Sequence, residues 1–178
     1  METKQLPERK VIRLRGYDYS LPGNYFVTIV TQDWLCLFGD VMDGEMQASD
    51  AGRMVEKALA QIPEVHANTM VDHLVVMPNH IHFIITLQGG VWLSEIIRRF
   101  KSYTTHLYIE GVKNGGWPRF NRKLWQHNYY EHIIRNQHAH DCIAAYIACN
   151  PARWSKDAIN PWHDKDIDHI MRQVLAYG

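Results

Sequence analysis

The chain of 178 residues has few cysteines, no net charge and no apolar run of the length that crosses a membrane. No stretch approaches the roughly 20 apolar residues of a membrane helix, and residues 1–10 lack the apolar core of a signal peptide. The cysteines are odd in number and lack C-x-x-C spacing (Cys36, Cys142 and Cys149). We therefore expect a soluble protein of the reducing cytoplasm, with no membrane partner.

The overall composition is that of an ordinary globular protein. Hydrophobic residues make up 46% of the chain and charged residues 21%, and neither an internal repeat nor a low-complexity tract is present. We expect one domain over residues 1–178, with a basic N-terminal arm over 1–20 and a C-terminal tail over 155–178. The tail contains a short acidic run, which is typical of surface.

Charge is unevenly distributed, although 19 basic residues balance 19 acidic ones. Residues 1–15 hold five basic and two acidic side chains, and residues 98–123 hold seven basic and one acidic. Zero net charge argues against strong nucleic-acid binding, but segregated basic segments can form the positive face that a polyanion needs. A solvated helix face with a basic arm is the alternative interpretation.

The spacing of apolar residues predicts a mixed fold. Strands are expected at 25–31, 70–77, 80–87 and 130–135, and helices at 49–63, 93–108 and 136–149. Pairs with glycine at 38–39 and 43–44 indicate turns. This order, βαββαβ followed by a helix, is that of an α+β domain of the ferredoxin-like or RRM-like class, in which an antiparallel sheet carries helices on one face.

Two histidines begin the strand expected at 80–87. His80 and His82 are separated by one isoleucine, and residues two apart in a strand point to the same face. Both imidazoles can therefore converge on one metal ion, because imidazole is the commonest metal-binding side chain. The alternative is that the spacing of His80 and His82 arose by chance, since the chain has 11 histidines.

Tyr146 and Asn150 are four residues apart and share one face of the helix expected at 136–149. A hydroxyl and an amide that point together from a helix end are a candidate nucleophile and a candidate third metal ligand. With two imidazoles, the amide oxygen completes a neutral ligand set that leaves positions open for a phosphate. The alternative is a tyrosine that packs in the core.

Aromatic and basic residues alternate over residues 117–130. This mixture suits unstacked bases and a phosphate backbone, since each base stacked on an aromatic ring contributes ~1–3 kcal/mol. We expect two of the aromatics to serve the core instead. The residues expected to contact nucleic acid are Arg13, Arg15, Arg98, Arg99, Lys101, Arg119, Arg122, Lys123, Trp125 and Tyr130.

An ordered set of segments over residues 13–154 resembles the REP-associated tyrosine transposases of the single-tyrosine HUH endonuclease superfamily. The segments are GYDYS, YFVTI, LFG, VVMPNHIH, FKSYT, WQ with YYEHIIRN, and YI with NPARW. One departure is Phe83, where relatives often carry glycine.

The resemblance implies that His80 and His82 bind Mg²⁺ or Mn²⁺, of which Mn²⁺ suits histidine better, with Asn150 as a third ligand. It implies that Tyr146, on a C-terminal catalytic helix, is the nucleophile of a DNA transposase. Such an enzyme cleaves and rejoins single-stranded or hairpin DNA through a 5′-phosphotyrosine intermediate, on substrates like repeated extragenic palindromes. The protein would act as a monomer or homodimer.

Two other functions are compatible with parts of the pattern. A metal-free RRM-like nucleic-acid-binding regulator would need the sheet and the basic helix but not Tyr146 and Asn150. A small metal-dependent nucleotide hydrolase would use His80 and His82 but not the tyrosine.

Overall fold

A computed structural model describes residues 21–162, so Arg13, Arg15 and most of the expected tail lie outside the described part. The strands are β1 (Gly23–Val30), β2 (Gly39–Met42), β3 (Glu45–Ala48), β4 (Thr69–Val76), β5 (His80–Leu87) and β6 (Tyr130–Ile134). The helices are η1 (Gln32–Trp34), α1 (Asp50–Ala60), α2 (Ile62–Val65), α3 (Leu93–Asn114), α4 (Gln137–Cys149) and η2 (Pro151–Lys156). Along residues 21–162 no helix is both long and apolar enough to cross a membrane.

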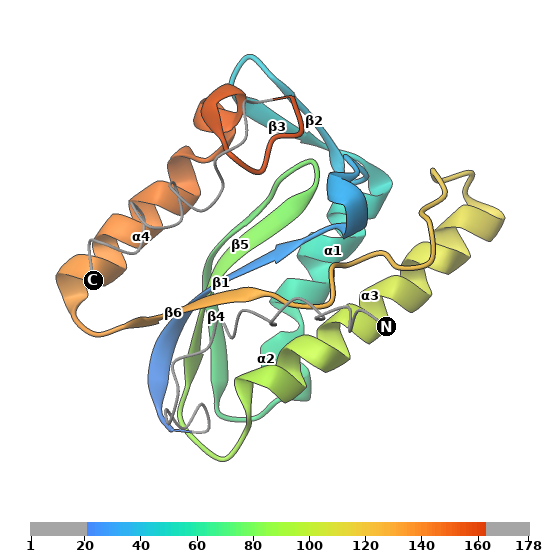
Figure 1. Ribbon diagram of the computed structural model, residues 1–178. Helices are drawn as coiled ribbons and strands as arrows, with labels where there is room; N and C mark the ends of the chain where they lie inside the picture. The colour runs from blue at the N-terminus through green and yellow to red at the C-terminus, as the bar shows by residue number, and fades with distance from the viewer. Residues whose placement is uncertain (1–20, 163–178) are drawn as a thin grey trace, which may run out of the picture.

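The main sheet has four antiparallel strands in the order β4-β5-β1-β6 (Figure 1). The chain passes through α1 between β1 and β4, and through α3 between β5 and β6. With the strands in this spatial order, the βαββαβ unit is that of a ferredoxin-like fold. The fold class predicted from the sequence is confirmed.

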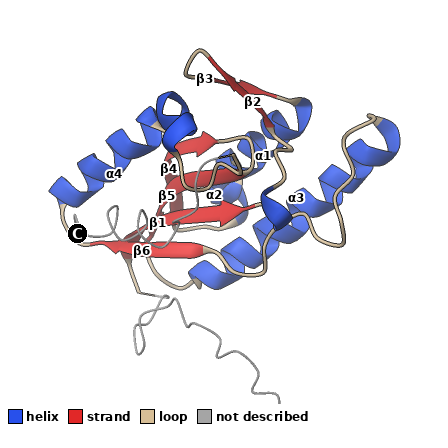
Figure 2. Ribbon diagram, turned by 45° about the horizontal axis from the view of Figure 1, so that its top comes forward, coloured by secondary structure: helices blue, strands red, loops and turns tan. Residues whose placement is uncertain are grey.

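The two sides of the sheet carry different helices, as Figures 1 and 2 show: α1, α2 and α3 lie on one side and α4 on the other. Side chains alternate along a strand, so β1 and β5 supply apolar residues to both layers. Tyr25, Val27 and Ile29 belong to the larger core with α1 and α3. Phe26 and Ile84 belong to a smaller core under α4.

Three local features differ from the sequence-based prediction. Asp43 and Gly44 form the turn of a two-stranded hairpin, β2 and β3, where only turns were predicted. The first helix was predicted to run to Pro63, but α1 ends at Ala60. Pro63 lies instead in the first turn of α2, where its missing N–H removes no helical hydrogen bond. Helix α3 continues past Gly111 to Asn114, and the ring of Trp117 packs directly on this glycine; a Cβ there would lie 2.2 Å from that ring.

The loop that follows α3 is held against this helix by hydrogen bonds from one partly buried and one buried side chain. The ammonium of Lys101 donates hydrogen bonds to the carbonyl oxygens of residues 126–128 at 2.9–3.3 Å. Trp125 is buried beside Phe38 and Phe100, and its Nε1 donates to Thr104 Oγ1 at 2.9 Å. Lys101 and Trp125 thus fix the loop from within, whereas the sequence indicated that they contact nucleic acid.

We predict that Lys101→Ala lowers the free energy of unfolding by about 1.5–3 kcal/mol, because it removes a charged donor from three backbone carbonyls. Arg98→Ala is the matched control, since this exposed side chain bonds only to Glu95 among the described residues. It should leave the midpoint of urea unfolding nearly unchanged. Equal midpoints for the two variants would contradict the role given to Lys101.

Candidate active site

His80 and His82 are the first and third residues of β5, and both are fully buried on the sheet face covered by α4. Their ring centroids are 4.5 Å apart. Strand alternation therefore brings the two imidazoles together, as the sequence predicts.

The side chain of Asn79 determines which nitrogen of His80 is free. Its Nδ2 donates to the carbonyl oxygens of Trp34 at 3.2 Å and Ile159 at 2.8 Å, so Oδ1 must be the atom that faces His80 Nδ1 at 2.9 Å. Because Oδ1 only accepts, Nδ1 carries the proton and Nε2 keeps a lone pair. This Nε2 is buried and has no hydrogen-bond partner among the described residues.

His82 is held by its neighbour on β1. Thr28 is directly opposite His82 in the sheet register, and its Oγ1 lies 2.7 Å from His82 Nδ1. The ring of Phe26 packs against His82 and, edge to face, against Tyr146. The other ring nitrogen, Nε2, lies 3.4 Å from the Tyr146 hydroxyl. These contacts orient His82 toward α4.

Helix α4 brings Tyr146 and Asn150 to the two histidines. The side chain of Asn136 caps the start of the helix by accepting from Ala139 N at 2.8 Å, as the sequence predicts. Ile143 and Ile147 then anchor the helix in the smaller core. Asn150 is buried at the C-cap, and its Oδ1 has no hydrogen-bond partner among residues 21–162.

Asp157 joins this site, although the sequence-based interpretation placed it in a surface tail. The segment after η2 folds back, so that residues 157–160 are buried. Asp157 Oδ1 accepts from Ile159 N at 2.8 Å, and Oδ2 lies 3.8 Å from His80 Nε2. The apolar residues Trp154 and Ile159, which flank the aspartate, were the only signal that this segment returns to the core.

These residues fit a divalent metal ion. A ring nitrogen of His80, one of His82 and a carboxylate oxygen of Asp157 all lie within 4.8 Å of one another. The buried acceptors His80 Nε2 and Asn150 Oδ1 have no hydrogen donor among the described residues, and a cation would satisfy both. Imidazole with carboxylate and amide oxygen suits Mn²⁺ or Mg²⁺.

Burial keeps both histidines neutral. It lowers the pKa of His80 to about 4, although Asp157 and Asn150 oppose the change. Burial and the neighbouring His80 lower the pKa of His82 well below its usual range. A metal binds the neutral imidazole, so at neutral pH no proton has to be removed from either ring.

Burial also raises the pKa of Tyr146 above its usual value, and the carboxylate of Asp157 adds to this effect. Asn150 and Arg153 act in the opposite direction but are weaker. The phenol is therefore protonated at neutral pH and is a poor nucleophile without further positive charge nearby.

Phe83 follows His82 and points to the opposite side of the sheet. It is fully buried in the larger core with α1 and α3. Its ring therefore stays out of the space beside the histidines, despite the glycine that relatives often carry there.

Five of the basic residues predicted to contact nucleic acid are exposed and fall into two groups. Arg119, Arg122 and Lys123 are exposed in the loop after α3. This loop reaches the sheet where Gln126 N donates to Val30 O, and Val30 is opposite His80 in the register. The loop therefore meets the sheet at the end where the histidines lie.

Arg98 and Arg99 form the other group, exposed on α3 and paired with Glu95. Helix α3 and α4 lie on opposite sides of the sheet, so these two arginines are separated from the histidine face (Figure 2). Tyr130 is different: it is opposite Thr28 in the register and shares the histidine face.

Comparison with known proteins identifies relatives over most of the chain. Residues 47–150 match the family model of IS200-like transposases. An uncharacterised protein of Haemophilus influenzae is 34% identical over 176 residues, covering 85% of this chain and 92% of that protein. The REP-associated tyrosine transposase of Escherichia coli K12 is 34% identical over 91 residues, covering 49% of this chain and 48% of that protein.

Two solved structures share the fold. The structure of a REP-associated tyrosine transposase bound to a REP hairpin has a TM-score of 0.59 at 23% identity, covering 92% of this chain and 87% of the other. A proposed transposase of Deinococcus radiodurans R1 has a TM-score of 0.51 at 16% identity, covering 76% of this chain and 95% of the other.

We predict that Asp157→Asn weakens Mn²⁺ binding by about tenfold or more, since it keeps the side-chain shape but removes the only charge among the candidate ligands. Asn150→Ala removes a neutral ligand and should have the smaller effect. Calorimetric titration measures both, and Asp40→Asn, an exposed carboxylate on β2, is the control. If Asp157→Asn binds Mn²⁺ like the control, Asp157 is not a ligand.

Proposed function

This chain belongs to the IS200-like transposase family, and we propose that it cleaves and rejoins single-stranded or hairpin DNA with Tyr146 as the nucleophile. The observation that carries the proposal is the partly buried contact at 3.4 Å between the Tyr146 hydroxyl and His82 Nε2. It joins the candidate nucleophile on α4 to the candidate metal ligands on β5.

The reaction is a transesterification at phosphorus. The oxygen of Tyr146 attacks a backbone phosphate, the bond to the 3′ oxygen breaks, and a 5′-phosphotyrosine forms. The phenol loses its proton in this step and the departing 3′ oxygen gains one, so no water is consumed. Because the new ester retains the energy of the broken one, a second 3′-hydroxyl can be joined in the reverse reaction without ATP.

This reaction needs positive charge beside the phosphate and correct placement of the phenol. We propose that the chain's own residues provide for both. His80, His82, Asp157 and Asn150 would hold Mg²⁺ or Mn²⁺, which supplies positive charge beside the phosphate and the phenolic oxygen. At a pKa of ~10, a free phenol is ionised to about one part in a thousand at pH 7, a handicap of roughly 4 kcal/mol, and the raised pKa of Tyr146 increases it. Phe26 fixes the ring of Tyr146 and so contributes the placement that helps to offset this handicap.

Hairpin DNA is the substrate we propose, because a structurally similar transposase is described as bound to a REP hairpin. Tyr130, on the histidine face, is placed to contact an unpaired base, and the loop with Arg119, Arg122 and Lys123 is placed to contact the backbone. Arg98 and Arg99 remain candidates for a second, more distant contact.

The RRM-like alternative is disfavoured by the position of α4. RRM domains stack bases on an open sheet face. Here Ala139, Ile143 and Ile147 of α4 pack on Phe26 and Ile84 and cover that face. A nucleotide hydrolase would not need Tyr146, so a covalent adduct separates it from a transposase.

We predict that Tyr146→Phe binds hairpin DNA and Mn²⁺ nearly as well as wild type but forms no covalent protein–DNA adduct, because it loses only the reacting oxygen. Denaturing electrophoresis after incubation with labelled hairpin and Mn²⁺ detects the adduct. Tyr130→Phe, on the same sheet face, is the matched control and should keep adduct formation. If Tyr146→Phe forms adducts and Tyr130→Phe does not, the nucleophile is Tyr130. If wild type forms no adduct, the proposal is rejected.

We predict that Arg119→Ala, Arg122→Ala and Lys123→Ala together weaken hairpin binding and reduce the slope of log affinity against log salt by about 1 per lost phosphate contact. The double variant Arg98→Ala and Arg99→Ala should reduce the slope less, because α3 lies on the far side of the sheet. Fluorescence anisotropy over a salt series measures both. The reverse order would move the DNA interface to α3.

A further inference from the structure

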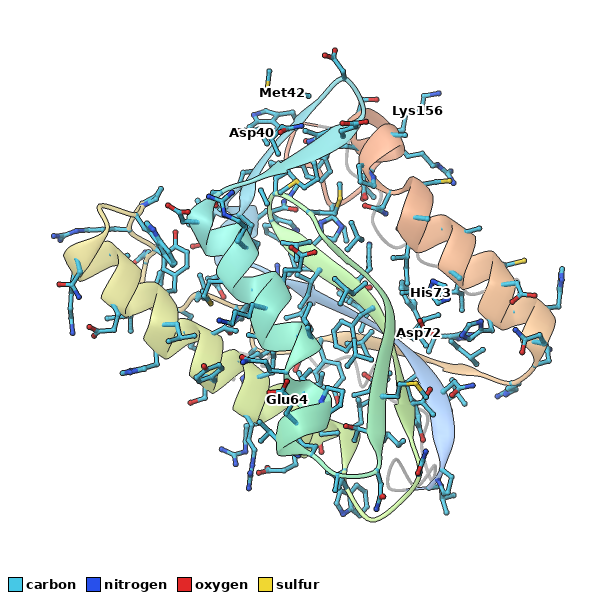
Figure 3. The ribbon with its side chains drawn as sticks, turned by 180° about the vertical axis from the view of Figure 1, so that it is seen from behind. Asp40, Met42, Glu64, Asp72, His73 and Lys156 are labelled. Atoms are coloured by element: carbon cyan, nitrogen blue, oxygen red, sulfur yellow. The ribbon has the colours of Figure 1, made fainter. Side chains whose placement is uncertain are left out.

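A second cluster of metal-ligating side chains lies between β4 and α4 and shares no residue with the site described above. It consists of Asp72 and His73 on β4 and His140 on α4, whose candidate ligand atoms all lie within 4.8 Å of one another. Figure 3 shows Asp72 and His73 between the edge of the sheet and α4. We propose that these three residues bind a transition-metal ion of the Zn²⁺ class.

The distances are close to those of a formed site. His73 Nε2 lies 3.6 Å from Asp72 Oδ1, and His140 Nε2 lies 4.0 Å from Asp72 Oδ2. Ligand atoms at ~2.1 Å from a tetrahedral zinc ion are about 3.4 Å from each other. Side-chain movements of less than about 1 Å would therefore bring all three ligands to one ion.

The backbone of β4 is shaped to present two consecutive residues to the same side. The pairing with β5 is irregular between Asp72 and Leu74, and His73 has a φ of 44°, in the left-handed region. A regular strand would point Asp72 and His73 to opposite faces. Asp72 Oδ1 accepts from His73 N at 2.9 Å, which holds the carboxylate in place over this bulge.

His140 completes the cluster from the other layer. It is mostly buried, with 19% of its side chain exposed, and its ring is nearly perpendicular to that of His73 at a centroid distance of 5.4 Å. Its Nδ1 is buried without a hydrogen-bond partner among the described residues, although Asp141 Oδ1 lies 3.6 Å away. Its Nε2 is the nitrogen that faces Asp72.

The ligand chemistry selects the class of metal. Two imidazoles and one carboxylate are a common protein ligand set for Zn²⁺ and leave a fourth position for water. Mg²⁺ prefers oxygen ligands, and this cluster lacks even the amide oxygen that Asn150 adds beside His80 and His82. The ion would join the edge strand β4 to α4, the helix that carries Tyr146.

Stoichiometry tests the proposal directly. In titrations of the full-length protein against a chromophoric Zn²⁺ chelator, wild type should bind one more equivalent than either His73→Gln or His140→Gln. His106→Gln, an exposed histidine on α3, is the matched control and should bind as many equivalents as wild type. His80→Gln should keep the equivalent that His140→Gln loses, which separates this site from the one at β5.

Thermal unfolding gives an independent measurement. Zn²⁺ at about 100 times its dissociation constant should raise the Tm of wild type by roughly 5–10 °C. The rise should be smaller in His140→Gln than in His106→Gln, because the ion can no longer join β4 to α4. Equal stoichiometry and equal Tm shifts for these two variants would overturn the proposal.

Discussion

The buried side chain of Asn79 is the constraint on which the site depends. Its amide joins η1, through the carbonyl of Trp34, to the segment after η2, through the carbonyl of Ile159. Its oxygen fixes the tautomer of His80. The backbone of the same turn is held too, since Asn79 O accepts from Thr31 N. One amide thus sets the position of a histidine and the path of the segment that carries Asp157.

Burial of the two histidines has a cost that the rest of the fold must offset. A buried acceptor without a donor destabilises a folded protein by about 1–3 kcal/mol, and His80 Nε2 and Asn150 Oδ1 are both of this kind. Burial of apolar side chains in the larger core between the sheet, α1 and α3 offsets the destabilisation caused by these two acceptors. A bound cation would convert this cost into binding energy, because the ligands are already desolvated, neutral and oriented.

Local periodicity accounts for what the sequence could predict. Alternation in a strand places His80 and His82 on one face, and the helical repeat places Tyr146 and Asn150 together, without any tertiary information. Asp157 could not be found in this way, because its position depends on the long-range contact between Asn79 and Ile159. The contacts of Lys101 with the loop could not be predicted either, because a basic residue on a helix gives no sign that distant carbonyls surround it.

Helix α4 is held less firmly than the helices on the other side of the sheet, because the apolar core beneath it is the smaller of the two. Candidate metal ligands occur toward both of its ends: His140 near the start and Asn150 at the C-cap. Tyr146 lies between them. The contact of Tyr146 with His82 is therefore only as well fixed as the helix itself, so an ion at either end would restrict where the phenolic oxygen can lie. Placement of the nucleophile would then depend on ligands from β4 and β5 as much as on the apolar contacts of α4.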